Sequence, residues 1–361
     1  MSQPPDFSAE YNVQSRREIG ETLMIRLNPA ASITEEFAEK VRNENRNDRL
    51  MKLAPILVLI ALVVVFTASC GLSFISGGNL LNILNQMALP LVVALGLTFV
   101  IMLGSIDLSI DGTVGMAGSL FACLVLNSEF GTDLGLMGAV IAVGASMLCG
   151  LAVGLCHVYL KIPSFMASFA FMYICKGIGM VSYQGHPPTI QDPFIKSLPT
   201  ASFLGIPFIT WVAIAMFALC YFIQERTAFG RHIYAVGTNE SIPRSVGVSV
   251  EKVKVGVFTL AGFLFGVAGV IGAIRLGQGQ IAIGAGKMFP AQAAVVVGGT
   301  SLAGGKGGVT NTIVGVLIMT VLDNGLLVLG VNPNIRTGIQ GVIILVSVIL
   351  TVARGAKVIS K

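Results

Sequence analysis

The stretch VVVGGTSLAGGKGGVTNTIVG, residues 295–315, places a glycine-rich turn with a lysine between two apolar runs. A phosphate-binding loop needs a first glycine, four further residues, and then Gly-Lys followed by a Ser or Thr whose hydroxyl reaches Mg²⁺. Here Lys306 is followed by Gly307, and Thr300 stands where the first glycine is required. The stretch therefore fails as a nucleotide-binding loop at two positions.

The sequence also lacks the other common motifs that bind cofactors or metals. GQGQIAIGAG at 277–286 does not fit the GxGxxG pattern of a dinucleotide-binding turn. The six cysteines lie in apolar segments without CxxC spacing, and the three histidines form no HExxH motif or Cys/His cluster. We expect no metal site, no catalytic residues and no cofactor in this chain.

Two carboxylates, Asp107 and Asp111, are the most informative charges because they follow an apolar run directly. A carboxylate within or beside a membrane span is costly, so it is usually functional or paired. The alternative is structural, with Asp107 or Ser109 capping the helix that follows. Lys176 lies within another apolar run, where its long side chain could snorkel to the membrane surface.

The composition of the chain indicates that these charged residues belong to a membrane protein. The chain is 54% hydrophobic and 11% charged, with a mean hydropathy of +0.83, values far too apolar for a water-soluble domain of this length. About 20 apolar residues cross a bilayer core. The sequence therefore predicts an all-α, polytopic membrane protein of about ten transmembrane helices, at roughly 53–75, 85–104, 110–127, 134–158, 162–182, 205–224, 255–276, 289–304, 309–330 and 335–353.

Basic residues orient these spans. With both termini in the cytosol, 18 of the 23 Lys and Arg residues lie on the cytosolic side, as the positive-inside rule requires. We expect a charged cytosolic extension at 1–52, a transmembrane domain at 53–353 and a cytosolic tail at 354–361. Within the extension, Ser32 and Glu35 have capping-box spacing. Of the two long connections, 183–204 is expected outside and 225–254 in the cytosol.

Glycine-rich stretches at membrane depth suggest broken spans, because irregular backbone is tolerated there only where it lines a cavity or is buried in protein. GSIDLSIDGTVGMAG, 104–118, echoes the stretch at 295–315 with a constant offset of 194 residues. Gapped helices in corresponding halves of a membrane protein indicate a transport pathway. A chance likeness between two glycine-rich segments is the alternative.

Three sequence blocks resemble the permease subunits of monosaccharide ABC importers, the ribose/xylose/arabinose/galactose permease family. They are LVVALGLTFVIMLGSIDLSIDGTVGMAGS at 91–119, TAFGRHIYAVGTNESIPRSVGVSVEKVKVGVFTLAGFLFGVAGVIGA at 227–273, and AAVVVGGTSLAGGKGGVTNTIVGVLIMTVLDNGLLVLGV at 293–331. KMFPAQ at 287–292 departs from the usual Tyr-Glu-Leu-Asp-like run. The sequence therefore leaves open a pentose, a hexose or a polyol as substrate.

This resemblance implies a multi-pass protein of the prokaryotic inner membrane. Its expected partners are a second permease copy or a paralogous permease, cytosolic ABC ATPase subunits, an extracytoplasmic sugar-binding protein and membrane lipid, with no nucleic acid. ATP and magnesium would bind the separate ATPase, so this chain would not be an enzyme.

The resemblance also assigns roles to residues. ATPase coupling is expected of a cytosolic segment with exposed charge, aromatic anchors for a partner groove and glycine turns: Thr227, Phe229, Gly230, Arg231, Tyr234, Gly237 and Asn239. An uncharged sugar needs hydrogen-bonding side chains along its path. The candidates for this translocation pathway are Asn85, Gln86, Asp107, Ser109, Gln292, Thr300, Ser301 and Asn324.

Two other transport classes remain alternatives. A branched-chain amino acid or polyol permease has related architecture, although its motifs fit less well. An ion-coupled secondary transporter would use Asp107 or Asp111 as an ion or proton site and would work without ATP.

Overall fold

The computed structural model describes residues 53–355, while the side chains of residue 344 and of residues 346–355 lie outside that description. The predicted extension at 1–52, its capping box and the last six residues of the chain lie outside it too. After a first helix, Leu53–Cys70, the elements run in this order: η1 Leu72–Ile75, α3 Gly77–Met102, α4 Ile110–Leu124, α5 Leu136–Tyr159, α6 Ser164–Tyr183, α7 Pro193–Ser197, β1 Ser202–Phe203, β2 Ile206–Pro207, α8 Phe208–Arg226, α9 Ala228–Thr238, α10 Ser241–Ser245, α11 Val250–Leu276, η2 Ile281–Ile283, α12 Met288–Val297, α13 Val309–Val328 and α14 Pro333–Gly355.

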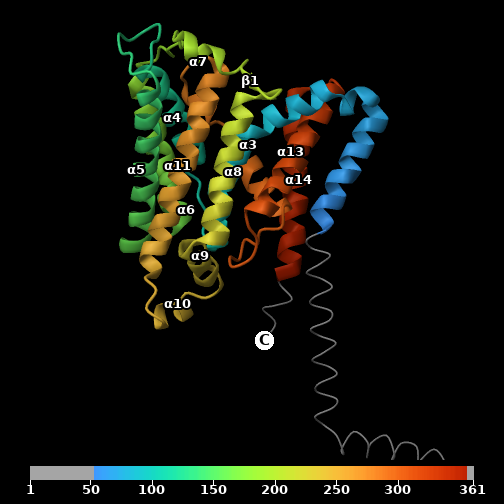
Figure 1. The fold of residues 1–361 in the computed structure, drawn as a ribbon. Coiled ribbons are helices and arrows are strands. Elements are labelled where there is room, and N and C mark those ends of the chain that lie inside the picture. Colours follow the sequence, from blue (N-terminus) through green and yellow to red (C-terminus); the bar gives the residue numbers. More distant parts are fainter. Residues whose placement is uncertain (1–52, 356–361) are drawn as a thin grey trace, which may run out of the picture. The chain divides into compact units, whose positions relative to one another are not determined.

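Within the described residues, seven helices are long and apolar enough to cross a membrane. They are Leu53–Cys70, α3, α5, α6, α8, α11 and α13. Because the rest of the described chain is also mainly helical (Figure 1), the protein is an all-α, polytopic membrane protein. The two-residue strands β1 and β2 form a small antiparallel hairpin outside the helices.

Two predicted spans are short helices followed or preceded by non-helical backbone. α4 has 15 residues and α12 has 10, which correspond to lengths of about 22 Å and 15 Å at 1.5 Å per residue. The predicted span at 289–304 is therefore too long, since its helix ends at Val297 and residues 298–308 form turns. Residues 103–109 likewise form a non-helical break between α3 and α4.

The two ends of the helical bundle carry the long connections. α9 and α10 lie at one end, and α7 with the β1–β2 hairpin lies at the other (Figure 1); these ends are called the α9 end and the α7 end below. The sequence predicts a loop at 225–254, but the structure contains two helices there, α9 and α10. Thr227 begins α9 by accepting a hydrogen bond from the Gly230 N–H. Asp192 caps α7 in the same manner.

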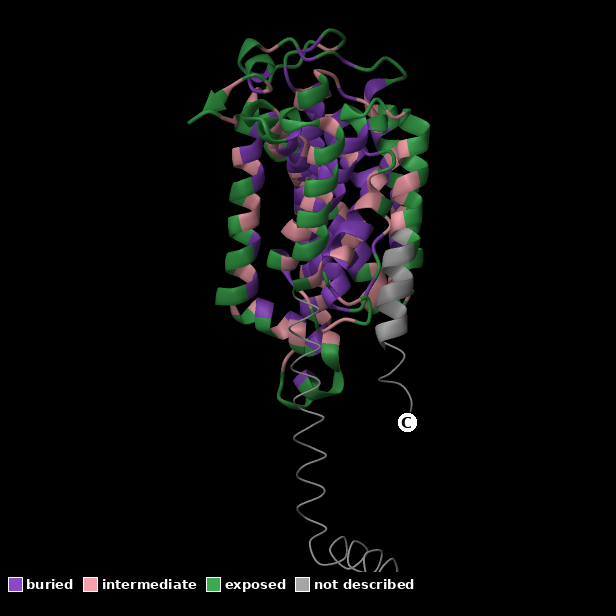
Figure 2. Ribbon diagram, turned by 90° about the vertical axis from the view of Figure 1, so that its right-hand side faces the viewer, coloured by how far each residue is buried: buried purple, intermediate pink, exposed green. Residues whose placement is uncertain are grey.

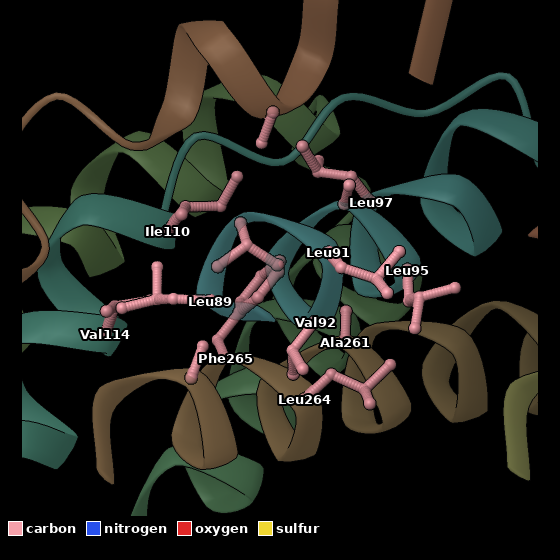
Figure 3. Packing of buried hydrophobic residues seen from close by; sticks show 14 of the residues in the cluster. Leu89, Leu91, Val92, Leu95, Leu97, Ile110, Val114, Ala261, Leu264 and Phe265 are labelled. Atoms are coloured by element: carbon pink, nitrogen blue, oxygen red, sulfur yellow. The ribbon is translucent and has the colours of Figure 1, made fainter. Parts of the chain in front are cut away.

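The core lies around α3, which is surrounded by other helices for most of its length. Every residue from Leu91 to Met102 is buried, and Figure 2 shows the buried ribbon concentrated in the interior of the bundle, with exposed residues on the outer helices. Figure 3 shows Val92 of α3 beside Ala261 and Leu264 of α11. A helix buried on all sides needs no amphipathic pattern, which explains why the apolar run of α3 lacks a polar face.

Small residues allow the backbones of α5 and α11 to approach closely. A Cβ added to Gly262 would overlap the backbone of Ser146 and Gly150, and one added to Gly150 would overlap that of Phe258 and Gly262. Without a hydrophobic driving force between helices in lipid, such backbone contact supplies the packing energy. Gly144, also on α5, has open space around its missing Cβ.

We expect Gly262→Leu to destabilise the protein by about 1–3 kcal/mol, the usual cost of overpacking a close contact. The measurement is thermal unfolding of purified protein in detergent. Gly144→Leu is the matched control, since it adds the same side chain to α5 without an overlap. Equal melting temperatures for the two variants would contradict the close approach of α5 and α11.

Candidate functional site

The first helix break, residues 103–109, has its backbone paired with α6 and with its own aspartate. The Leu108 and Ile106 N–H groups donate to the hydroxyls of Ser168 (2.9 Å) and Ser164 (3.2 Å). Asp107 is 1% exposed and its Oδ1 accepts the Ser109 N–H at 2.8 Å. The Asp107 carboxylate therefore holds the turn directly before α4, while Ser109, the N-cap residue of α4, makes no side-chain cap hydrogen bond.

The second break, residues 298–308, is a compact turn stabilised by its own polar groups. The Ser301 N–H donates to the Lys306 carbonyl at 3.0 Å. The fully buried Thr300 accepts the Gly308 N–H on its hydroxyl at 3.4 Å. Gly304, with φ +83°, has the left-handed backbone that favours glycine. The glycines that first suggested a phosphate loop therefore shape a membrane-protein turn.

The two breaks contact each other although about 200 residues separate them in the sequence. The Gly305 N–H donates to the Met102 carbonyl, the last residue of α3, at 2.9 Å. A Cβ added to Gly104 would lie 3.3 Å from the Ala303 carbonyl oxygen. Both stretches show the same order of helix, break and helix. The offset of 194 residues does not hold in the structure, because it pairs Gly112, which lies within α4, with Lys306, which lies within a turn.

Helix α9 packs against the second break and against the end of α3, directly before the first break. The Tyr234 hydroxyl donates to the Gly307 carbonyl at 2.7 Å. Gly237 lies so close to the Met102 carbonyl that an added Cβ would overlap it, and Gly305 lies against Thr238. A displacement of α9 therefore acts directly on the end of α3 and on the turn that precedes α13.

Gln224, in the last turn of α8, connects the same region to α13. It is 3% exposed, and its Oε1 accepts the Val309 N–H at 2.8 Å, at the first residue of α13. Its amide group donates to Glu225 at 2.7 Å. The sequence analysis missed this residue, although a glutamine near the end of an apolar run is a signal that could have identified it.

The predicted coupling residues divide into an inward and an outward group. Phe229 packs against Gly256 of α11, and the half-buried Tyr234 contacts the second break. The expectation that these two aromatic residues reach outward into a partner's groove is therefore revised. Arg231 and Asn239 are exposed, and Asn239 Oδ1 accepts hydrogen bonds from Ser241 at the start of α10.

Tyr234 keeps its proton at neutral pH. Burial raises the pKa of the Tyr234 hydroxyl above its ordinary value, and the nearby Glu225 carboxylate adds to the increase. The hydroxyl therefore remains a hydrogen-bond donor to Gly307 over the physiological range, since it would ionise only above its already alkaline ordinary value.

The predicted pathway residues lie in several parts of the structure. Asp107, Ser109, Thr300 and Ser301 belong to the two breaks. Asn324 on α13 is 2% exposed, and its Oδ1 accepts a hydrogen bond from Asn79 of α3 at 3.0 Å, an interhelical contact.

The other three pathway residues are partly exposed and lie on α3 and α12: Asn85, Gln86 and Gln292. Asp111 is the other carboxylate singled out by the sequence. Its two oxygens accept the N–H groups of Gly286, Lys287 and Met288 at 2.9–3.1 Å and so hold the start of α12. Both membrane aspartates are therefore occupied by backbone N–H groups.

Such an arrangement of apolar spans, two interacting helix breaks and an end helix packed where they meet is that of a membrane transport subunit. Residues 79–348 match the family model described as branched-chain amino acid transport system / permease component, and the chain belongs to this family.

Among its relatives, the ribose import permease protein RbsC of Escherichia coli K12 is 34% identical over 308 residues, covering 82% of this chain and 92% of the relative. Ribose import permease protein RbsC of Haemophilus influenzae is 35% identical, covering 84% and 92%. The xylose transport system permease protein XylH of Haemophilus influenzae is 28% identical, covering 81% and 94%. No solved structure gives a significant match.

We expect Gln224→Leu to lower the stability of the protein by about 1–3 kcal/mol, because the Val309 N–H would lose its acceptor in a buried position. Thermal unfolding in detergent measures this. The control is Glu225→Gln, which keeps an acceptor for the Gln224 amide group on an exposed side chain. If Gln224→Leu unfolds at the temperature of the unaltered protein, the buried contact with α13 is not formed.

Proposed function

We propose that this chain is the permease subunit of an ATP-driven importer and forms the membrane pathway for a monosaccharide. The sugar permeases among its relatives, aligned over most of both chains, support the substrate class. The observation that carries the proposed mechanism is the packing of α9 on the second break and on the end of α3. The alternative of an amino acid substrate has only the name of the family model in its favour.

In this proposal the protein lies in the prokaryotic inner membrane with about ten helical segments and with both termini in the cytosol. The α9 end then faces the cytosol, where positively charged loops are expected. The partners are a second permease, identical or paralogous, a cytosolic ABC ATPase that holds ATP and magnesium, and an extracytoplasmic sugar-binding protein. This chain itself hydrolyses nothing and binds no cofactor.

Coupling follows from the contacts of α9. The exposed Arg231 is available to the ATPase, while on the same helix Tyr234 contacts the second break and Gly237 contacts Met102 at the end of α3. A movement of the ATPase that displaces α9 would therefore shift Met102 and Gly307 together. Ion-coupled transport is less well supported, because the carboxylates of Asp107 and Asp111 are already bound by backbone N–H groups.

The main experiment is reconstitution of the chain with its ATPase and binding-protein partners in liposomes, with uptake measured over labelled neutral pentoses and hexoses. We expect ATP-dependent accumulation, and Arg231→Glu should abolish both uptake and co-purification of the ATPase. Lys161→Glu is the control, because it makes the same charge change at an exposed site between α5 and α6. ATP-independent uptake driven by an ion gradient would refute the proposal.

Tyr234→Phe tests the inward half of the coupling helix. Because it removes one hydrogen bond to the second break but leaves the exposed face of α9 intact, the ATPase should still co-purify while ATP-driven uptake falls about 2- to 10-fold, the equivalent of one net hydrogen bond. Uptake per ATP hydrolysed is the quantity to compare. An unchanged ratio would show that the Tyr234 contact with Gly307 does not transmit movement.

A further inference from the structure

The β1–β2 hairpin exposes two large apolar side chains at the α7 end. Phe203 is 63% exposed and Leu204 is 78% exposed, the highest value among the large apolar side chains of the described residues. The sequence from 197 to 224, which contains the hairpin and almost all of α8, has no charged residue. Exposed apolar surface of this kind is unfavourable in water, so it indicates contact with a less polar medium or with a partner.

The turn of this hairpin departs from the usual residue preference. Leu204 and Gly205 join the paired residues Phe203 and Ile206 with φ angles of +52° and +76°, a left-handed pair that Asn-Gly forms most readily. A leucine in this region is a steric outlier, because its Cβ crowds the neighbouring backbone. Asparagine would form the same turn with less strain. The leucine is therefore explained by its apolar side chain rather than by the turn.

Trp211, the only tryptophan of the chain, fixes the hairpin to the first turn of α8. Its Nε1–H donates to the Phe203 carbonyl at 3.0 Å, and its ring meets the Phe203 ring edge-on with the centroids 5.9 Å apart. The Phe208 N–H donates to the Ala201 carbonyl at 2.9 Å, and Pro207 has no N–H to pair. The hairpin therefore satisfies these backbone groups internally, as a segment in contact with lipid must.

The length of α8 places the contact between Trp211 and the hairpin at the edge of the hydrocarbon core. The 19 residues of this helix span about 28 Å at 1.5 Å per residue, close to the ~30 Å of a bilayer core. Arg226 lies in its last turn, so Trp211 is at the opposite boundary, where tryptophan is enriched. In Figure 2 the exposed arrow of β1 projects sideways from this end of the bundle. The hairpin tip therefore points along the membrane surface rather than away from it.

We propose that the β1–β2 hairpin is a membrane anchor whose tip, Phe203 and Leu204, inserts between the phospholipids of the leaflet at the α7 end. Lipid is the occupant because the apolar tip continues the largely exposed surface of the span α8, lies at the boundary of the hydrocarbon core and has no charged neighbour in sequence. Thr227 is both the C-cap of α8 and the N-cap of α9. An anchor at the first end of α8 therefore fixes the depth of α9 as well.

The test uses the full-length chain in phosphatidylcholine liposomes and reads the fluorescence of a single tryptophan. The double variant Phe203→Trp, Trp211→Phe moves the only tryptophan onto the hairpin and keeps an aromatic ring at both positions. We expect brominated lipid to quench its emission, more strongly with bromine near the headgroup than near the chain end, while iodide on both sides of the membrane has little effect. Asp133→Trp in the Trp211→Phe background is the control: it lies exposed in the loop between α4 and α5, and iodide should quench it.

Leu204→Asn, added to the double variant, separates insertion from folding. Because asparagine suits the turn, the melting temperature should not fall, while quenching by headgroup-brominated lipid should decrease and quenching by iodide should increase. A pattern that Leu204→Asn leaves unchanged would overturn the proposal.

Two other results with the double variant would also overturn it. Quenching by iodide but not by brominated lipid would place the hairpin in water. Protection from both quenchers would show that a second copy of the chain covers the tip instead of lipid. The fluorescence measurements do not depend on ATP-driven import, which is tested separately by uptake.

Discussion

Irregular backbone inside a membrane has to find all of its hydrogen bonds within the protein, and this constraint organises the structure around two helix breaks. Lipid offers no donor or acceptor, so each unpaired backbone group would cost several kcal/mol. The first break draws on two serines of α6 and on Asp107, while the second uses Thr300 and its own turn. The bond from Gly305 to Met102 then joins them. Because neither break satisfies its backbone alone, the position of each depends on its surroundings.

The same constraint makes α9 an integral part of the packing. It lies on the region where two breaks meet, and glycine at 237 allows its backbone to touch the end of α3. Gln224 adds a side-chain acceptor at the start of α13. The helix is thus exposed on one face, while on the other it packs against the end of α3 and is hydrogen-bonded to the second break.

Two carboxylates serve the backbone in the same way. The carboxylate of Asp107 accepts the Ser109 N–H beside the first break, and that of Asp111 accepts three N–H groups at the start of α12. Both carboxylates therefore stabilise local backbone geometry where lipid would offer no hydrogen-bond partner.

The sequence by itself determined the class of protein, because hydropathy over about 20-residue windows depends only on local composition. It also located the glycine breaks and predicted a cytosolic segment at 227–239. It did not reveal that Phe229 and Tyr234 contact the chain's own helices and turns, or that Asp111 holds α12. Nor did it identify Gln224, because its role depends on a neighbour from a remote part of the chain. Tertiary structure alone decided which polar groups were paired and which were left free, since hydrogen bonds and charge interactions in the membrane are set by distance in space rather than by spacing along the chain.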